Sequence, residues 1–283
     1  MRPPSIKQAW ALPIVICGAL LAFAPADAVK AQASKAPAAK APAAKTPATT
    51  PPAAKPTATK LPAAREIIDR YIKEIGGRAA ILARSSAHVI GTASLPAAGI
   101  TGKMEMFHAK PNMFLQRISL PGIGDIEEGF DGKVGWTTSA LTGPILFEGK
   151  QLEERAFDAD FYDELKNPDR FESIATVEQT TFEERPVYKI RLVKKIGGED
   201  VEFYDVQTGL RAGGVSTRES PMGPMQGTTS FSDYKKFGML RQPSTMKVTT
   251  LNVQMVMSIL SMEYDTVDPA VFAPPPQIKA LIK

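Results

Sequence analysis

The chain has 283 residues, with 34 Lys and Arg against 30 Asp and Glu, so its formal net charge is +4. Residues 1–61 hold eight of the basic residues and one acidic residue, which leaves the rest of the chain slightly acidic. We therefore expect no binding to nucleic acid, because such binding needs a basic surface. Cys17 is the single cysteine and lies near the N-terminus, so disulfides, zinc–thiolate sites and cysteine nucleophiles are excluded from the domain that follows.

Residues 1–33 have the order of a secretory signal peptide. A short basic start precedes the apolar run 9–24, and small residues at 24–33 offer several A-x-A cleavage sites. The apolar run is shorter than a membrane-spanning helix and contains Pro13. The sequence predicts an exported, periplasmic protein with a cleaved signal peptide. An uncleaved N-terminal anchor is the alternative.

Residues 34–61 form a linker rich in Lys, Pro, Ala and Thr. Such a segment has little apolar surface to offset the entropy of ordering, so we predict a disordered, extended tether. Its lysines could alternatively contact anionic lipid headgroups or a cell-wall polymer. The folded domain is then expected at 62–283.

The first element of this domain is a helix over 62–77. Apolar residues recur at helical spacing, and Gly76-Gly77 ends the pattern. Residues 78–86 are expected to add one or two turns. A second amphipathic helix is predicted over 148–166.

From residue 87 onward the apolar period changes to two, which is typical of β-strands. Turn signals at hairpin spacing separate about eleven or twelve strands, so the sheet is predicted to be antiparallel. The strands are expected at 88–95, 99–109, 112–120, 124–132, 133–139, 171–182, 186–195, 199–205, 210–219, 227–237, 241–250 and 250–264. The fold class is therefore mainly antiparallel β with a few helices (α+β).

One face of this sheet is apolar along its length. In 251–259, the alternate residues Leu251, Val253, Met255, Met257 and Ile259 are expected to share that face. Only two helices of useful size are available to cover it. A sheet larger than its helical cover indicates a hydrophobic surface that is left for a ligand.

The sequence offers little for catalysis or metal binding. His88 and His108 are the only histidines, and no G-x-S-x-G nucleophile motif is present. We expect His108 to lie at the rim of the sheet. The acidic residues of 158–164 (DADFYDE) are expected on the solvated face of the second helix, since the glycine of a calcium loop is absent. The protein is predicted not to be an enzyme and to bind no metal or cofactor.

The stretch 127–136 (EEGFDGKVGW) is interpreted as a turn rather than a reaction centre. Asp131-Gly132 predicts a two-residue hairpin turn with positive φ at both positions. Glu127 and Glu128 are neighbours on one strand, so they point to opposite faces and cannot form a facing acid pair.

Several motifs together resemble the LolA family of periplasmic lipoprotein carriers. They are KPNMF (110–114), the break at Pro121, DGKVGW (131–136), the hairpin YDVQTGL (204–210) and the tail VDPAVFAPPP (267–276). In two places this chain departs from the family pattern. Lys110 replaces the arginine that holds the lid closed in the family, and Gly135 shifts the tryptophan by one position.

The resemblance implies an open half-barrel of about eleven strands with a helical lid over a cavity for acyl chains. Candidate cavity or lid residues are Met104, Met106, Lys110, Met113, Leu115, Trp136, Met222, Met225, Leu251, Val253, Met255, Met257 and Ile259. Flexible methionine side chains adapt to ligands of variable shape, although they also fill ordinary cores.

Two functions follow from this interpretation. The preferred one is a monomeric envelope protein that carries or chaperones a lipid or lipoprotein by its acyl chains. The alternative is a regulatory module of the envelope-stress type, which binds a membrane-protein segment and senses lipid.

Overall fold

The structure is a computed structural model that describes residues 60–220 and 222–282. The predicted signal peptide and linker lie outside the described residues. The helices are α1 (Ala64–Glu74), α2 (Arg78–Leu82), α3 (Gly149–Asp158) and α4 (Pro276–Lys279), with the 3₁₀ turns η2 (Pro96–Ala98), η3 (Pro168–Arg170) and η4 (Pro269–Phe272). None of these helices is long and apolar enough to cross a membrane.

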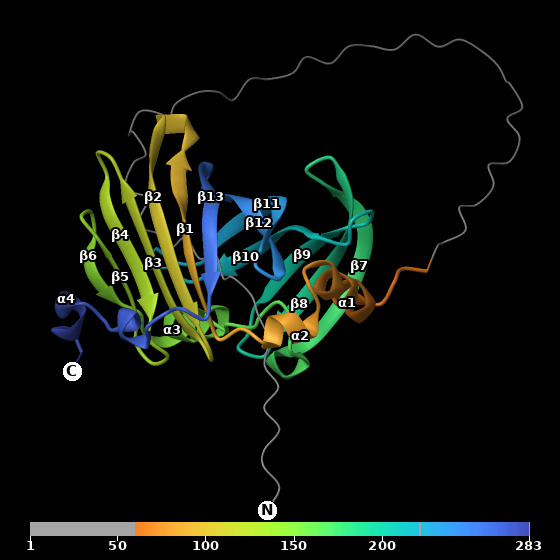
Figure 1. The fold of residues 1–283 in the computed structure, drawn as a ribbon, viewed down its shortest axis with the longest axis horizontal. Helices are drawn as coiled ribbons and strands as arrows, with labels where there is room; N and C mark the ends of the chain where they lie inside the picture. The colour runs from red at the N-terminus through yellow and green to blue at the C-terminus, as the bar shows by residue number, and fades with distance from the viewer. Residues whose placement is uncertain (1–59, 221, 283) are drawn as a thin grey trace, which may run out of the picture.

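One antiparallel sheet of thirteen strands forms the body of the domain (Figure 1). The strands are β1 (Ser86–Leu95), β2 (Ile100–Ala109), β3 (Met113–Leu120), β4 (Gly124–Phe130), β5 (Gly135–Ser139), β6 (Gly143–Leu146), β7 (Phe171–Phe182), β8 (Arg185–Lys194), β9 (Glu199–Asp205), β10 (Arg211–Arg218), β11 (Met225–Phe237), β12 (Leu240–Thr250) and β13 (Val253–Tyr264). Their spatial order is 6-5-4-3-2-1-13-12-11-10-9-8-7, so the sheet stays open between β6 and β7.

This order divides the sheet into two runs of hairpin-connected strands, β1–β6 and β7–β13, which meet where β1 pairs with β13. The antiparallel fold and the open sheet are confirmed, whereas the expected number of about eleven strands is too low. The strand β6 was not predicted. It has only four residues and begins with Gly143 and Pro144, so it shows no alternation of apolar and polar residues.

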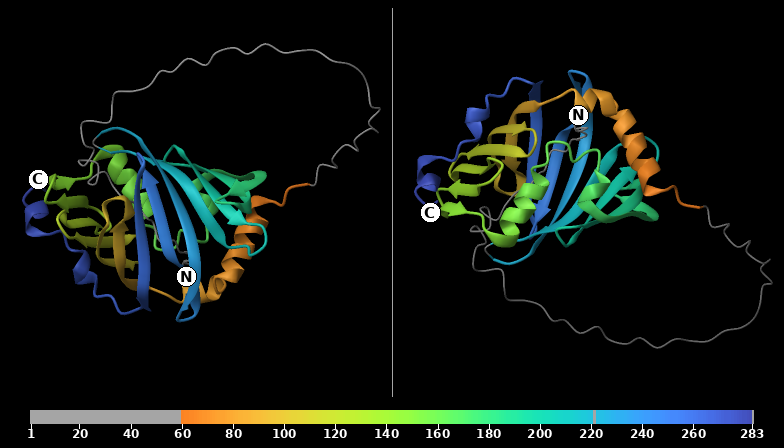
Figure 2. Two further views of the ribbon diagram at one scale, coloured as in Figure 1. Left: turned by 90° about the horizontal axis from the view of Figure 1, so that it is seen from above. Right: turned by 90° about the horizontal axis from the view of Figure 1, so that it is seen from below.

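The curved sheet carries the helices at its ends. Figure 2 shows α1 and α3 on one side of the sheet, where α1 packs on β7 and α3 packs on β5. Tyr71 of α1 contacts Tyr204 of β9 edge to face, with ring centroids 5.5 Å apart. The opposite face of β2–β5 is covered by the C-terminal segment, whose Phe272 and Ile278 are buried there.

The helix predicted over 148–166 is wrong beyond residue 158, where α3 ends. The backbone N–H of Phe161 donates to the carbonyl oxygen of Pro111 (3.0 Å), and the N–H of Tyr162 donates to the Asp160 carboxylate (3.0 Å). Phe161, Tyr162 and Leu165 are buried in the core beside α1. The Phe161–Pro111 hydrogen bond and the burial of these side chains take the place of helical contacts.

The turn at Asp131-Gly132 also differs from its prediction. Gly132 has a positive φ of 99°, but Asp131 does not, and the pairing of Phe130 with Gly135 encloses a four-residue loop. The Asp131 carboxylate accepts the backbone N–H groups of Lys133 (2.8 Å) and Val134 (2.7 Å). An aspartate that binds the backbone ahead of it forms a local turn without a second positive φ.

Candidate functional site

We call the face of the sheet that meets α3 and residues 159–170 the inner face. His108 of β2 lies 2.9 Å from the carbonyl oxygen of Ala159, and Arg155 of α3 forms an ion pair with Glu128 of β4. On the second half of the sheet, Arg211 contacts Glu164 at 3.7 Å. The irregular segment after α3 therefore lies against both halves of this face.

An uncharged patch, the inner apolar face, occupies the central strands. It consists of the buried residues Val89, Ala93, Leu95, Met104, Met106, Ile118, Leu120, Phe231, Met246, Val248, Met255, Met257, Ile259 and Met262. Among the described residues, the α-helices pack most closely on β5, β6 and β7. They pack less closely on β1, β12 and β13. The sheet is larger than its helical cover, as expected, but the side chains of the inner apolar face are buried and pack against one another.

A β-bulge keeps the apolar residues of β13 on the inner face. Gly91 pairs with Ile259 and Ile90 pairs with Ser261, so Leu260 is an extra residue on β13. The bulge shifts the alternation by one residue. Ile259 and Met262 both point inward as a result, and Leu260 is exposed on the other face.

The structure brings five of the predicted site residues together on the inner apolar face: Met104, Met106, Met255, Met257 and Ile259. The expectation that Leu251 shares this face is wrong, because Leu251 and Asn252 form the turn between β12 and β13. A two-residue turn removes its own residues from the strand alternation. Val253 begins β13 two residues before Met255 and therefore keeps to the same face, but it is exposed at the end of the strand.

The other predicted residues lie elsewhere. Leu115 and Trp136 are buried on the outer face under Phe272 and Ile278, with Met113 packed against them. Lys110 is exposed in the loop before β3, Met222 is exposed in the loop before β11, and Met225 begins that strand. Sequence reasoning missed Ile118, Leu120, Phe231, Met246 and Val248 as members of the inner apolar face. The alternation Met246-x-Val248 carried a usable signal.

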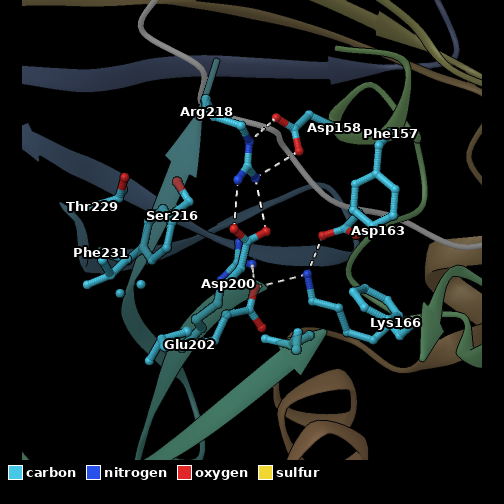
Figure 3. Close-up of a pocket in the computed structure, with 17 residues that line it drawn as sticks. Phe157, Asp158, Asp163, Lys166, Asp200, Glu202, Ser216, Arg218, Thr229 and Phe231 are labelled. Carbon is cyan, nitrogen blue, oxygen red and sulfur yellow. Dashed lines mark hydrogen bonds and ion pairs between the residues drawn. The ribbon is translucent and has the colours of Figure 1, made fainter. Parts of the chain in front are cut away.

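A polar cavity of about 110 Å³ lies beside the inner apolar face (Figure 3). Asp200 and Glu202 of β9 line it, together with Arg218 of β10 and Lys166 from the segment after α3. Phe231 belongs to both the cavity wall and the inner apolar face. The inner face therefore joins an apolar surface to a charged one within a single concavity.

Every charged group around this cavity has a partner of opposite sign. Arg218 binds Asp158 (Nε–Oδ2, 2.7 Å) and Asp200 (2.6 Å), and Lys166 binds Glu202 (2.9 Å). Burial alone would lower the pKa of Arg218, but Asp158 and Asp200 outweigh it, so this pKa is raised well above its usual value. Burial would raise the pKa of Glu202, yet Lys166 and Arg211 lower it. These groups are held as ion pairs.

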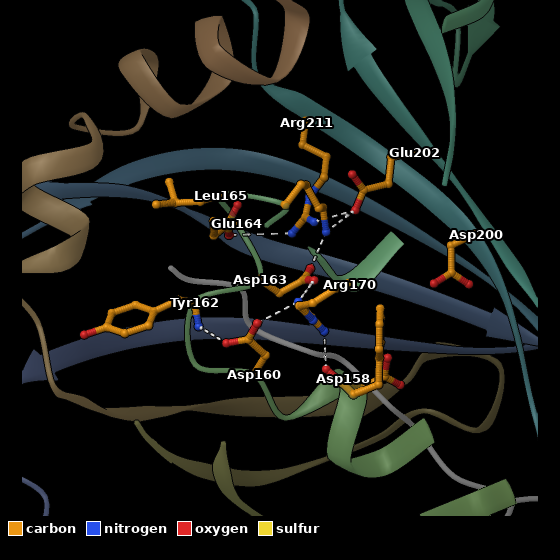
Figure 4. A network of polar contacts seen from close by, with 12 residues as sticks. Asp158, Asp160, Tyr162, Asp163, Glu164, Leu165, Arg170, Asp200, Glu202 and Arg211 are labelled. Atoms are coloured by element: carbon orange, nitrogen blue, oxygen red, sulfur yellow. Dashed lines mark hydrogen bonds and ion pairs between the residues drawn. The ribbon is translucent and has the colours of Figure 1, made fainter. Parts of the chain in front are cut away.

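A wider charged network surrounds the segment after α3 (Figure 4). Arg170 binds both Asp160 (2.7 Å) and Asp163 (2.6 Å). Burial raises the pKa of Glu164, and nearby Arg211 only partly offsets this effect. The expectation that residues 158–164 face solvent is wrong, because their carboxylates find cationic partners inside the domain.

The same contacts hold α3 to both halves of the sheet. Arg155 pairs with Glu128 on β4 and lies over the ring of Phe114 (5.2 Å), while Asp158 receives Arg218 from β10. Glu154 accepts the backbone N–H of Glu219 at 2.7 Å. Arg155 and Arg218 thus hold α3 to the sheet, whereas Lys110 is exposed.

Both histidines have structural partners. His88 lies 2.8 Å from Glu105 and stacks on Phe107. The expectation that His108 lies at the rim is wrong: its ring is 3% exposed and sits between Phe114 and Phe161. The prediction that Glu127 and Glu128 point to opposite faces is confirmed, since Glu127 binds Arg117 on the outer face and Glu128 binds Arg155 on the inner face.

The fold and its inner face define a class of protein: an open, curved antiparallel sheet with an apolar concavity crossed by a short helix. Comparison with solved structures supports this at the level of the fold. A DUF1329 family protein from Desulfovibrio piger has 12% identity and a TM-score of 0.51, over 74% of this chain and 95% of that chain. This likeness shows a shared fold.

Two further solved structures are similar to this chain. A LolA superfamily protein from Nitrosomonas europaea has 10% identity over 76% of this chain and 99% of its own, with a TM-score of 0.49. A domain described as an outer membrane lipoprotein-sorting protein, from Vibrio parahaemolyticus, has 12% identity over 74% and 95%, with a TM-score of 0.47. No protein-family model and no curated protein sequence matches this chain.

Proposed function

We propose that this protein is an exported envelope protein that binds the acyl chains of a lipid or lipoprotein on the inner apolar face, as a carrier or chaperone. The observation that carries the proposal is the uncharged, methionine-rich surface on strands that the described α-helices do not closely cover. Because these side chains are already shielded from water, an acyl chain would bind by entering among them and taking the place of their mutual contacts.

The free energy of binding would come from removing the acyl chain itself from water. Each buried methylene contributes about 0.8 kcal/mol, so a sixteen-carbon chain gains on the order of 10 kcal/mol before ordering costs. Methionines dominate the central strands, with Met104, Met106, Met246, Met255 and Met257 all buried there. Their unbranched side chains can repack around acyl chains of different length.

A binding experiment with matched variants tests this function. Met255→Gln keeps the side-chain length but places an amide on the inner apolar face, and Met239→Gln makes the same change in the exposed turn between β11 and β12. Burying an amide without a partner costs about 1–3 kcal/mol, so M255Q should weaken binding of a fluorescent sixteen-carbon fatty acid about tenfold. M239Q should bind as the wild type does.

Native mass spectrometry of the protein extracted from its own envelope gives the second test. Co-purified lipid or lipoprotein supports the carrier function. Protein that is consistently free of lipid and binds no acyl probe contradicts it. Capture of a membrane-protein segment without lipid would instead favour the regulatory alternative.

A further inference from the structure

Four strand connections along one edge of the sheet carry no charged residue. They join β1 to β2, β3 to β4, β5 to β6 and β12 to β13, and the uncharged stretches around them are 95–102, 120–124, 139–147 and 249–262. We call these four connections the uncharged rim. Figure 1 shows the β1–β2 turn at the top of the view, on the side away from α1, α2 and α3.

The pairing of the strands places these connections next to one another. Ser94 near the end of β1 pairs with Val256, close to the β12–β13 turn. On the other side, Lys103 pairs with Ser119, which brings the β3–β4 turn beside the β1–β2 turn. Because the strands alternate in direction, all four connections lie at the same end of their strands.

Apolar side chains project from this rim into solvent. Leu251 is 59% exposed and Leu141 is 43% exposed, and Val253 is also exposed. Exposed apolar side chains that gather along one edge indicate a contact surface.

Within the β1–β6 half of the sheet, the opposite ends of the strands have a different composition. The β2–β3 loop contains Lys110, and the β4–β5 loop contains Asp131 and Lys133. This contrast assigns an orientation to that half, because only its rim end can approach an apolar environment without desolvating charge. The other half is not divided in this way, since its β8–β9 and β10–β11 connections at the rim end contain Lys195 and Glu219.

The backbone at Leu251 adds a second observation. Leu251 and Asn252 have positive φ values of 48° and 65°, a conformation that favours Asn and Gly and is costly for leucine. The leucine side chain is not buried in return. A strained backbone position that keeps a large, exposed apolar side chain indicates that this side chain contacts another molecule.

We propose that the uncharged rim docks on the surface of a lipid bilayer, with Leu251 and Leu141 entering the interfacial region. The rim lacks the charged and aromatic residues typical of protein-binding hot spots, and its apolar side chains stand at separate turns rather than on one flat patch. It is also continuous with the inner apolar face, since buried Met255 follows Val253 by two residues on β13. This continuity rests on the proposed function, whereas docking itself does not.

Site-specific fluorescence tests the docking. In a Cys17→Ser background of the full chain, an environment-sensitive NBD probe is attached at Leu251→Cys or, as the matched control, at Met239→Cys in the β11–β12 turn. With phosphatidylcholine vesicles, we expect a blue shift and higher intensity at position 251 and no change at 239. The shift should persist in high salt, because the rim carries no charge.

Other outcomes overturn the proposal. These are no shift at 251, equal shifts at both positions, a shift that needs anionic lipid, or a shift that depends on protein concentration without vesicles, which would indicate a second copy. Leu251→Asn supplies a variant that suits the turn and keeps the fold. It should weaken vesicle binding about tenfold through the lost apolar contact, while Met239→Asn should not.

The two proposals fail separately. Binding of the fatty-acid probe in solution with no shift at 251 would remove the rim docking and leave the acyl-chain function. A shift at 251 in a protein that binds no fatty acid would remove the acyl-chain function and leave the rim docking.

Discussion

The Nε2 atom of His108 donates a hydrogen bond to the carbonyl oxygen of Ala159 at 2.9 Å, which fixes the end of α3 against β2. The acceptor is a carbonyl, so Nε2 carries the hydrogen. The pKa of His108 is lowered to about 4, chiefly by burial and also by nearby Arg155, although the Ala159 hydrogen bond opposes these effects, so the ring is neutral at pH 7.

This depressed pKa predicts acid sensitivity. The unfolded histidine binds a proton near pH 6.5 and the folded one only near pH 4, so the stabilisation is fully present above pH 6.5 and is lost as pH falls to 4. The expected loss of unfolding free energy is about 3 kcal/mol. His108→Gln should flatten this part of the profile, measured by urea denaturation from pH 7 to 4. A His88→Gln control that flattens it equally would contradict the assignment.

The neighbours Glu127 and Glu128 provide a matched pair of variants. Glu128→Gln leaves the buried Arg155 without its carboxylate, and breaking a buried pair costs about 3–5 kcal/mol. Glu127→Gln breaks a pair with half-exposed Arg117, which costs about 0–1 kcal/mol. Chemical denaturation of both variants measures this difference. Equal losses of unfolding free energy in the two variants would contradict the burial of the Glu128–Arg155 pair and the exposure of the Glu127–Arg117 pair.

Arg218 is expected to control how firmly α3 is held. Arg218→Met leaves Asp158 and Asp200 facing each other without the cation between them, and should destabilise the protein by about 3–5 kcal/mol. Hydrogen exchange should rise first in residues 149–158. Arg218→Lys keeps the charge but loses the planar set of donors, so its effect should be smaller. Unchanged exchange in α3 for R218M would contradict the holding role.

Gly129 is expected to be irreplaceable because Trp136 lies on it. A Cβ at position 129 would be 2.2 Å from Cζ2 of Trp136, so Gly129→Ala should cost about 1–3 kcal/mol through overpacking. Trp136→Phe removes the second ring, and the double variant should lose less than the sum of the single variants. Emission of Trp136 in a Trp10→Phe background should shift to the red in G129A. Additive losses would contradict the contact.

The sequence predicted the features that depend on local alternation. The strands, the antiparallel sheet and the opposite directions of Glu127 and Glu128 all follow from a period of two. Features set by distant partners were not predictable. Asp158 was expected in solvent because its partner Arg218 lies 60 positions further on, and the bulge at Leu260 changes the phase within one strand. Trp136 was placed correctly in a strand, but only the C-terminal segment over it shows which face it occupies.

The pairing of β1 with β13 joins residues as far apart in sequence as Ala87 and Tyr264. The two runs of hairpins on either side consist of strands that follow one another along the chain, so each can assemble from nearby contacts. Pairing β1 with β13 costs more loop-closure entropy than pairing strands that are neighbours in the sequence, and topologies with such distant contacts fold slowly. The central strands, which hold the most apolar residues of the sheet, therefore come together late, and a newly made chain is prone to aggregation over that interval.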